Sequence, residues 1–412
     1  MNGLLTVSMI VKNEERFLAE CLASVKDVAD DIIVVDTGSE DRTIEVAKSF
    51  GARVIEIAWP NDFSAARNVG LEAVKTPWVL VLDADEELVQ DDIKTLQQAM
   101  EKPFADSYNV RIVSLMDRAE DLSESYVTRL FRSHPKIRFR GAVHEQVFQS
   151  VGDLGMTIQP LNVRLLHKGY LAAVVKERDK GKRNLDLIRD HLKANPNDAY
   201  MRWQLAQTLL GNGQFAEALS ASRQSLKLLP VTHPLWPVAH ITLARSLEAS
   251  GQPKRALRAL REGEMAYPAY TDFYYAQGHV HLRMGEWENA EKSFRKCLEL
   301  GEPKDFLMTE TGIGGFKSLY KLSQALHAQN RQKEALATLL VAIGNNPPFR
   351  EAWQGIFTIL IGTSMHAVLD AILMKLPLDT VIETISPWQN RNINEQNLLQ
   401  AAQERKAAIQ ES

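Results

Sequence analysis

The first 90 residues alternate short apolar runs with helical patterns, and this alternation restricts the fold more than any other feature of the chain. Four runs are rich in aliphatic and β-branched residues, at 6–11, 31–36, 53–59 and 78–87. Amphipathic patterns typical of helices separate them. Strands that are apolar along their length and joined by helices form parallel sheets covered on both faces. The sequence therefore predicts an N-terminal α/β domain with a mainly parallel sheet.

Acidic residues follow two of these runs where the strands end. Asp36 closes the second run, and Asp83 and Asp85 close the fourth. Ligands of such sheets bind beyond the carboxyl ends of the strands. On an extended segment, residues two apart project to one side, so Asp83 and Asp85 can hold one hard divalent cation. The same pattern is also compatible with a solvated strand end that opens into an acidic helix start.

The Gly-Ser turn after Asp36 excludes two common types of nucleotide site. An acid at this position is well placed for ribose hydroxyls or base amides, and the alternative is a turn or helix N-cap aspartate. The turn has neither the GxGxxG spacing of a dinucleotide site nor the sequence of a P-loop. We therefore expect neither a dinucleotide site nor a P-loop.

Arg67 and His167 are further candidates for ligand contacts. The Arg67 guanidinium can bind a phosphate, and the alternative is a surface pair with Asp62. His167 lies in what we expect to be a loop, as a metal or phosphate ligand.

Glu145 is the candidate general base. It follows His144 in a strand-like segment over 137–148, and neighbouring residues of a strand face opposite ways. We therefore expect only one of the two side chains to enter the site. The alternative is the polar outer face of a strand.

After residue 195 the strand signals stop and a repeat begins. Four alanines recur at intervals of 38, 34 and 45 residues: Ala218, Ala256, Ala290 and Ala335. Each follows a turn residue by five positions: Gly213, Gly251, Gly285 and Asn330. A unit of about 34 residues with a small residue at the helix crossing is typical of tetratricopeptide repeats. The two longer intervals predict inserted loops, and the stretch after 347 is expected to be helical.

Composition excludes several classes of function. The net charge is −4, with no basic domain that indicates a nucleic-acid partner. The most apolar stretch, 357–378, is interrupted by His366, Asp370 and Lys375, so no transmembrane segment is expected. The two cysteines lie far apart, and the N-terminus lacks a basic leader. These features predict a cytoplasmic protein.

Four segments, in their order and spacing, resemble the glycosyltransferase family 2 domain, which has the GT-A fold. They are VSMIVKNEE, IIVVDTGSEDRT, FSAARNVGLEA and WVLVLDADEEL. RFRGAVHE and HKGY resemble the subgroup of sublancin-type peptide S-glycosyltransferases and lipopolysaccharide-core glucosyltransferases, several of which carry tetratricopeptide tails.

The expected organisation joins this resemblance to the repeat. It comprises a GT-A domain (1–171), a helical linker (172–195), about four tetratricopeptide repeats (196–347) and a helical cap and tail (348–412).

The resemblance implies inverting transfer from a nucleoside-diphosphate sugar, with a UDP-sugar as the expected donor. Asp36 would contact the nucleoside, and Asn13, Arg67 and Asp83 would join it in donor binding. Asp83 and Asp85 would form the motif for Mg²⁺ or Mn²⁺, with Asp85 the more direct ligand.

The resemblance is less informative about the general base and the remaining metal ligand. His167 is assigned to the metal as well. Many family members supply an aspartate base after the sheet in a motif that this sequence lacks, and Glu145 is the best substitute. Catalysis is thus assigned to Glu145 and Asp85.

The acceptor is expected to be a peptide, a protein or a glycan. Repeat solenoids present concave surfaces for peptides, and the same repeats offer a surface for a homodimer.

Two other functions compete with this interpretation. A sugar-phosphate nucleotidyltransferase usually has a glycine-rich loop after its first strand, where this chain has KNEERF. A non-catalytic repeat scaffold with a relic first domain is the second alternative. The intact Asp36, Asp83 and Asp85 favour an enzyme.

Overall fold

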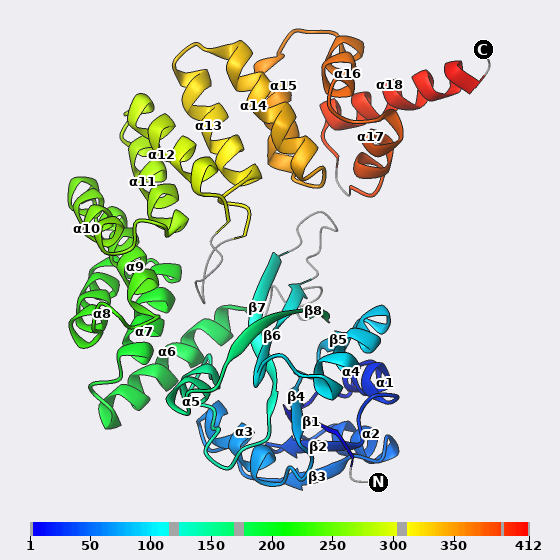
Figure 1. Cartoon of the computed structure of the whole chain (residues 1–412), viewed down its shortest axis with the longest axis vertical. Coiled ribbons are helices and arrows are strands. Elements are labelled where there is room, and N and C mark those ends of the chain that lie inside the picture. Colours follow the sequence, from blue (N-terminus) through cyan, green and yellow to red (C-terminus); the bar gives the residue numbers. More distant parts are fainter. Residues whose placement is uncertain (1–2, 115–122, 169–176, 303–310, 389–390, 411–412) are drawn as a thin grey trace. The chain divides into compact units, whose positions relative to one another are not determined.

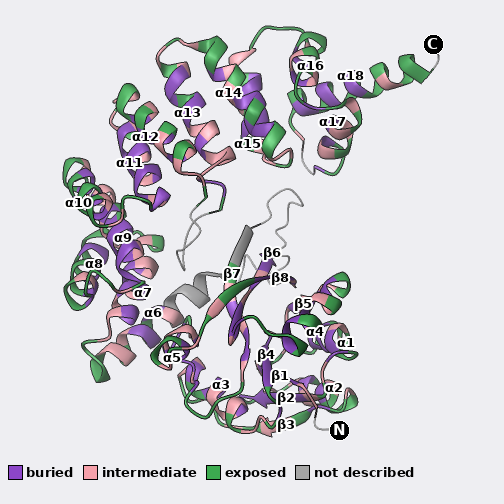
Figure 2. Cartoon of the chain, viewed as in Figure 1, coloured by how far each residue is buried: buried purple, intermediate pink, exposed green. Residues whose placement is uncertain are grey.

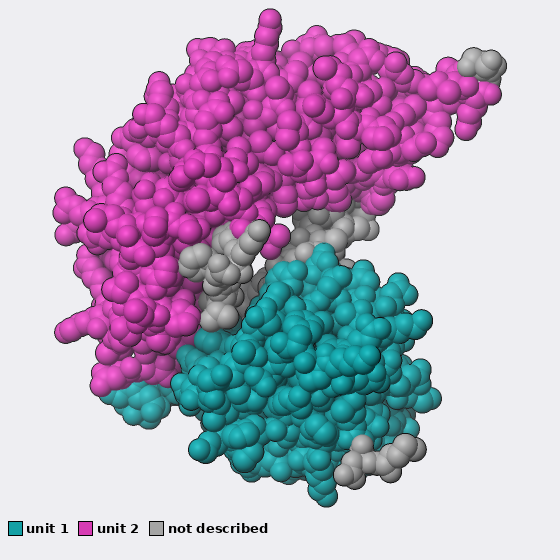
Figure 3. Space-filling model, viewed as in Figure 1, with its two compact units in different colours: residues 1–117, 121–196 teal, residues 118–120, 197–412 magenta. Residues whose placement is uncertain are grey.

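The computed structural model describes residues 3–114, 123–168, 177–302, 311–388 and 391–410. They form two compact units, which divide after Pro196 (Figure 3). Each unit is described separately below.

The first unit is built on a sheet that begins with four parallel strands, in the order β3-β2-β1-β4 (Figure 1). These strands are β1 (Leu5–Val11), β2 (Asp31–Asp36), β3 (Arg53–Glu56) and β4 (Trp78–Val81). Helices α1 (Leu18–Val25), α2 (Thr43–Ser49) and α3 (Phe63–Glu72) connect them. The predicted α/β fold is confirmed.

Beyond β4 the sheet becomes mixed and reaches eight strands, in the order β3-β2-β1-β4-β7-β6-β8-β5. The added strands are β5 (Glu86–Leu88), β6 (Ser107–Ser114), β7 (Ser123–Arg132) and β8 (Ile158–His167). β7 is antiparallel to β4 and β6, and β5 is antiparallel to β8. The remaining helices of this unit are the 3-10 turn η1 (Gln90–Asp92), α4 (Ile93–Glu101), α5 (Phe148–Asp153) and α6 (Glu177–Ala194).

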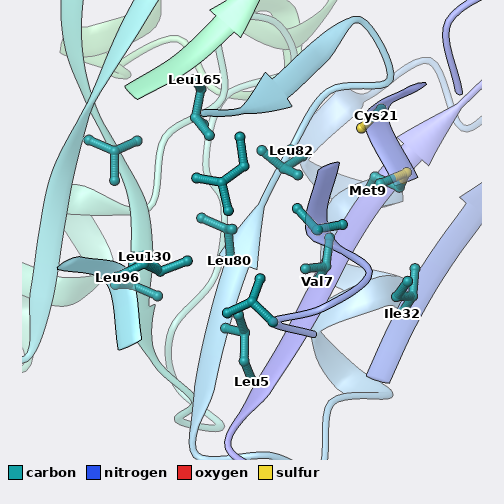
Figure 4. Close-up of a cluster of buried hydrophobic side chains, with 14 of the residues drawn as sticks. Leu5, Val7, Met9, Cys21, Ile32, Leu80, Leu82, Leu96, Leu130 and Leu165 are labelled. Atoms are coloured by element: carbon teal, nitrogen blue, oxygen red, sulfur yellow. The ribbon is translucent and has the colours of Figure 1, made fainter. Parts of the chain in front are cut away.

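Both faces of the central strands are buried, which explains their continuous apolar sequence. Leu5, Val7 and Met9 of β1 pack in one cluster with Leu80 of β4 and Cys21 of α1 (Figure 4). The alternate β4 residues, Val79 and Val81, pack in a second cluster with Phe131 of β7. Burial of both faces holds the strand ends, and therefore the residues that follow them, in fixed positions.

His167 was expected in a loop but is the last residue of β8. Two longer segments also differ from the sequence expectation, and both lie near the candidate site. The run 78–87 is not one strand, because a turn at residues 84–85 separates β4 from β5. The Glu86 amide donates to the Asp83 carbonyl at 3.0 Å, and the Asp83 amide donates to Glu86 Oε2 at 2.9 Å. A side chain therefore closes this turn, and Asp83 and Asp85 do not lie on an extended segment.

The segment 137–147 is a loop rather than the expected strand. A single backbone bridge joins Arg140 and Gln146. Gly141 (φ 102°) and His144 (φ 55°) lie in the left-handed region, which extended backbone does not visit. The alternation of faces expected for His144 and Glu145 therefore does not apply.

The second unit is a run of helix pairs, as the repeat predicts (Figure 1). The pairs are α7 (Ala199–Gly211) with α8 (Phe215–Leu228), α9 (Trp236–Ala249) with α10 (Pro253–Ala266), α11 (Thr271–Arg283) with α12 (Trp287–Leu300), and α13 (Phe316–Ala328) with α14 (Gln332–Asn345). All four repeat alanines are fully buried. The four turn residues all have positive φ, between 61° and 73°. The sequence alignment of the repeats is thus confirmed at both positions.

Four more helices follow the repeats and pack around Trp353 in a core that they share with α14 of the last repeat. They are α15 (Arg350–Ile359), α16 (Met365–Leu373), α17 (Leu378–Ile385) and α18 (Ile393–Gln410). A buried ion pair between Arg350 and Glu395 joins the first helix of this group to the last. Among the helices of the described residues, none has the length and apolar character needed to span a membrane.

Candidate active site

Asp36 lies at the carboxyl end of β2 and is almost completely buried. Its Oδ1 accepts hydrogen bonds from the amides of Gly38 and Ser39, both at 2.9 Å. Its Oδ2 is buried and has no hydrogen-bond partner among the described residues. A buried carboxylate oxygen without a partner costs free energy, so this atom is well suited to accept a hydrogen bond from a ligand.

Asn13 supports the turn that follows Asp36. Its amide donates to Ser39 Oγ at 2.9 Å, and its Oδ1 accepts from the Glu40 amide at 2.8 Å. The Asn13 backbone has a φ of 57°, a conformation that asparagine adopts more readily than most residues. The structure therefore brings the predicted donor residues Asn13 and Asp36 to one turn.

The ends of β1, β2 and β4 meet at one edge of the sheet. Val11 pairs with Asp36, and the Leu82 amide donates to the Ser8 carbonyl at 3.3 Å. Asp83 therefore begins at the same edge as Asp36. We call the region formed by these strand ends and the turns after them the carboxyl edge.

Arg67 points from α3 to the carboxyl edge, where it bridges two acids. Its Nε donates to Glu145 Oε1 at 2.5 Å, and its Nη2 pairs with Asp83 Oδ1. Gly70 allows α3 to approach the sheet, because a Cβ there would lie 2.6 Å from Ser8 Oγ. The alternative considered for Arg67, a surface pair with Asp62, does not form, since Asp62 instead caps α3 through the Ala65 amide.

The loop that carries Glu145 is attached to α3. Asn68 exchanges two hydrogen bonds with the Phe139 backbone, at 2.8 and 3.1 Å. The Phe63 amide donates to the Ala142 carbonyl at 3.0 Å. These contacts explain why Glu145, 78 residues after Arg67, meets its guanidinium.

Arg129 and Glu86 extend this arrangement from the other side of Asp83. Arg129 Nη2 donates to Asp83 Oδ2 at 2.8 Å and to Glu86 Oε1 at 2.9 Å. Charges thus alternate along one chain of contacts, from Glu86 through Arg129, Asp83 and Arg67 to Glu145. We call these five residues the charge network.

The charge network shifts the pKa values of its members strongly. Burial acts to raise the pKa of Asp83, but Arg129 and Arg67 outweigh it and hold that pKa well below its usual range. Burial acts to lower the pKa of Arg67, and the charges of Asp83 and Glu145 raise it instead. Burial raises the pKa of Glu86 to about 7 against the opposing charge of Arg129. Asp83 and both arginines are therefore charged at neutral pH.

Asp85 and His167 form a separate pair beside the network. His167 Nε2 lies 3.3 Å from Asp85 Oδ2, and β5 and β8 hold the two residues together through the pairing of Glu86 with His167. Burial acts to lower the pKa of His167, but Asp85 outweighs it, so the pKa is raised. The Asp85 backbone carbonyl also accepts from the Lys168 amide at 2.8 Å.

The predicted metal residues therefore divide into two groups. Both carboxylate oxygens of Asp83 are engaged by arginines, whereas Asp85 and His167 share one contact. No group of three or more His, Cys, Asp or Glu side chains is arranged for a metal in the part of the chain that the structure describes. Mg²⁺ and Mn²⁺ sites often take one or two protein ligands and complete their shell with substrate phosphates. Asp85 and His167 fit such a shared site.

Arg129 and Glu86 are the members of the site that sequence reasoning missed. Glu86 is one of several neighbouring acids, which looked like a solvated helix start, and Arg129 lies in a strand without a recognisable motif. The available signal was the apolar context of Arg129, because an arginine inside a buried strand needs an acidic partner.

A cavity of about 730 Å³ lies elsewhere in the first unit, next to the start of α3 and the end of α6. Asp62, Ala142 and His191 contribute to its wall, but no member of the charge network does. It shares only the loop of Ala142 with the candidate site.

Ligands of open α/β sheets bind beyond the carboxyl ends of the parallel strands, and Asp36 and the Asp83–Asp85 turn lie there in this chain. Residues 6–148 match the model of glycosyl transferase family 2, and residues 199–224 and 241–304 match tetratricopeptide repeat models. The N-terminal domain of this chain belongs to glycosyltransferase family 2, and tetratricopeptide repeats follow it. The predicted family and repeats are confirmed.

Several known proteins are similar to parts of the chain. A TPR repeat-containing protein of Synechococcus elongatus is 36% identical over 230 residues, which cover 54% of this chain and 56% of that protein. The SPbeta prophage-derived glycosyltransferase SunS of Bacillus subtilis is 29% identical over 47% of this chain and 46% of its own. The matches thus span about half the length of these relatives. The crystal structure of S. aureus TarS 1–349 with UDP-GlcNAc covers 63% of this chain and 92% of its own, at 16% identity and a TM-score of 0.39.

Proposed function

We propose that this protein is an inverting, metal-dependent glycosyltransferase that uses a nucleoside-diphosphate sugar, with a UDP-sugar as the expected donor. The observation that carries the proposal is the buried Oδ2 of Asp36, which has no hydrogen-bond partner among the described residues, at the same sheet edge as the Asp83–Asp85 turn. Membership of the domain in glycosyltransferase family 2 supports the reaction class.

Donor binding is assigned to three groups at the carboxyl edge. Asp36 Oδ2 accepts a hydrogen bond from the nucleoside, and Asn13 holds the turn that positions it. Arg67 Nη1 and Arg129 Nε are buried without partners among the described residues, so each can donate to a phosphate oxygen after a small movement. Asp83 anchors these two arginines.

Asp85 and His167 hold the Mg²⁺ or Mn²⁺ ion in this proposal. When bound there, the ion would provide Lewis-acid stabilisation of the charge on the departing diphosphate. Asp83 acts as the anchor of the network beside the ion, because its two oxygens already have arginine partners.

The chemical step forms a bond from the acceptor to the anomeric carbon and breaks the bond from that carbon to the diphosphate. The electron pair of the broken bond leaves with the nucleotide, and positive charge develops at the anomeric carbon. Attack comes from the opposite face, which inverts the configuration. The proton of the acceptor passes to Glu145, whose side chain faces Arg67 at the edge of the site.

The acceptor in this proposal is a peptide, a protein or a glycan, and the enzyme acts in the cytoplasm. Cys21 and Cys297 are free thiols and both are buried, which fits a reducing compartment.

The proposal is tested by thermal stabilisation of the full chain with a panel of nucleotides and nucleotide sugars, with and without Mn²⁺. We expect UDP-sugars to raise the Tm only when Mn²⁺ is present. Asp36→Asn keeps the shape of the side chain but changes its charge, so it should weaken stabilisation by the nucleotide. Absence of stabilisation by every nucleotide sugar would contradict the proposal. Donor hydrolysis by the purified protein further separates an enzyme from a repeat scaffold.

Glu145→Gln separates the two roles that the contacts of Glu145 allow. Glutamine still accepts the hydrogen bond from Arg67 Nε but cannot take up the acceptor proton. We expect turnover to fall by roughly 10²–10⁴-fold, with donor affinity nearly unchanged. Retained turnover would remove Glu145 as the base. A parallel loss of donor affinity would make it an anchor of Arg67 instead.

A further inference from the structure

Basic side chains recur at equivalent exposed positions on the second helices of consecutive repeats. The buried alanines of α8, α10 and α12 set the register. Five positions after each alanine stands an exposed arginine: Arg223, Arg261 and Arg295. Three residues earlier stand Ser220, Arg258 and Lys292, also exposed. In the fourth repeat the equivalent positions hold Leu340 and Ala337, so these rows end at α12.

The basic residues concentrate on α8 and α10, where Figure 2 shows long exposed faces. We call the following exposed side chains the basic face: Arg223, Lys227, Lys254, Arg255, Arg258 and Arg261. Exposed acids on the two helices are Glu217 and Glu262, so the charge of the face is strongly positive. The chain as a whole carries −4, and this face is therefore a local reversal of sign.

Few of these charges are neutralised within the protein. Among the described residues, Arg223, Arg258 and Arg261 take part in no ion pair, and Arg255 donates only to Gln252 Oε1. The hydrogen bond with His281 is the main cause of the lowered pKa of Glu286, and the charge of Lys254 adds to it. By contrast, Arg295 on the next helix pairs with Glu291 at 2.9 Å. The guanidinium groups of α10 are thus available to an external anion.

Apolar side chains lie at the carboxyl ends of the same two helices. Met265 at the end of α10 is 84% exposed, and Val231 just after α8 is 51% exposed. The Tyr267 hydroxyl donates to the Val231 carbonyl, so these two helix ends are neighbours. Exposed apolar residues beside several basic residues are typical of segments that bind the interface of a membrane.

We propose that the basic face binds the surface of a membrane rich in anionic lipids. Six positive side chains spread over two helices fit an extended anionic surface better than a single bound anion. Met265 and Val231 can enter the layer of lipid headgroups next to them. This inference does not depend on the glycosyltransferase activity, and it would place the enzyme next to membrane-borne acceptors.

The test is co-sedimentation of the full chain with vesicles of phosphatidylcholine alone and with vesicles in which about a third of the lipid is phosphatidylserine. We expect binding only to the anionic vesicles, weakening as salt increases. The triple variant Arg255→Gln/Arg258→Gln/Arg261→Gln should lower the partition coefficient by about 100-fold, because each basic residue near such a surface contributes about fivefold.

A matched control removes three exposed charges from the first unit, in the variant Lys94→Gln/Lys102→Gln/Lys136→Gln. It makes the same change in net charge and should alter partitioning by less than about threefold. Helical circular dichroism checks that both variants are folded. Met265→Ser should produce a smaller loss than the arginine triple.

Three outcomes would overturn the proposal. Equal binding to neutral and anionic vesicles would remove the role of charge. Equal losses in the two triple variants would show a general charge effect rather than a defined face. Tight binding of soluble polyglutamate with no binding to anionic vesicles would assign the face to an acidic protein partner.

Discussion

The first unit and the repeats of the second unit each bury titratable side chains, but in different surroundings. In the first unit, five charged residues from α3, the β4–β5 turn, β5, β7 and the 137–147 loop form the charge network. In the repeats, His240 of α9 is buried with no hydrogen-bond partner at either ring nitrogen among the described residues. It packs on Trp236 one helical turn away, with ring centroids 4.2 Å apart.

The proposed function accounts for this difference between the first unit and the repeats. A network of charges fixes side chains for a ligand, and every member needs its partner because a lone buried charge is costly. A repeat needs only to fill the space between neighbouring helices, so a neutral imidazole can replace an apolar residue there. The stability of the first unit should therefore decrease when a charged side chain is removed. The stability of the repeats should decrease when a buried neutral side chain becomes charged.

The largest effect is expected at the proposed metal pair. Asp85→Ala should lower transfer by at least about 10³-fold, because charge stabilisation by a bound ion contributes several kcal/mol to the transition state. The fold should survive, since the Asp85 side chain is partly exposed and pairs with His167 rather than with the charge network. The rate of steady-state transfer with Mn²⁺ measures the loss of activity, and the Tm of the variant shows whether the fold is intact.

The exposed Asp91 supplies the control for this variant. Asp91→Ala removes an equal charge from the same region and should leave turnover within about twofold, since surface substitutions usually have small effects. Wild-type turnover in Asp85→Ala, or full turnover of the wild type in excess chelator, would contradict the metal assignment.

Arg129→Met tests the sensitivity of the first unit to a missing charge. It leaves Asp83 without one of its two arginines and Glu86 without its ion pair. Removing one partner of a buried ion pair typically costs about 3–5 kcal/mol. Hydrogen exchange of the β1 and β4 amides measures the loss of stability in this unit.

Two companion variants sharpen the result for Arg129. Adding Glu86→Gln to Arg129→Met should recover part of the stability, because it removes one of the two carboxylates left behind. Arg42→Met breaks an ion pair of which both side chains are mostly exposed, and should cost less than about 1 kcal/mol. Equal losses in Arg42→Met and Arg129→Met would remove the distinction between the network and a surface pair.

The same contrast explains how much the sequence could predict. The repeats were recognisable because each signal, such as Gly251 and Ala256, acts within one helix pair. The strand ends at Asp36 and Asp83 were also visible, since parallel strands bring their carboxyl ends together. Arg129 was not, because its partners are 43 and 46 residues away and the pairing depends on the antiparallel β7.

The geometry of the Asp83–Asp85 segment was also beyond prediction. An apolar run followed by acidic residues predicts an extended segment. In the structure, the Glu86 side chain instead accepts a hydrogen bond from the Asp83 amide and closes a turn. A contact between a side chain and the backbone competes here with the strand, and propensity does not include such contacts.

His240 tests the sensitivity of the repeats to an added charge. Burial lowers the pKa of His240 to about 4, below the ordinary value of 6.5. Because the pKa of His240 is lower in the folded state than in the unfolded state, the unfolded chain binds the proton first as pH falls. The free energy of unfolding is therefore unaffected by His240 above pH 6.5 and decreases as pH falls from 6.5 toward about 4. The shift corresponds to at most about 3 kcal/mol. The stability difference between wild type and His240→Leu should therefore change over this pH range, followed by helical circular dichroism. A difference that is constant with pH would contradict the burial of a neutral histidine.

The smallest effect is expected at the turn inside each repeat. Gly251 has a φ of 73°, and a Cβ there would meet no atom within 4 Å, so a substitution changes backbone conformation alone. Gly251→Ala should cost about 1–2 kcal/mol, which is the strain of an L-residue in the left-handed region. Gly251→Asn should cost less, because asparagine already occupies the equivalent position of the fourth repeat as Asn330, with a φ of 61°. Denaturant unfolding of the three proteins should rank them glycine, asparagine, alanine. An alanine variant as stable as the wild type would contradict this prediction. It would show that the backbone of the turn can relax to a negative φ, although all four repeats have a residue with positive φ at this position.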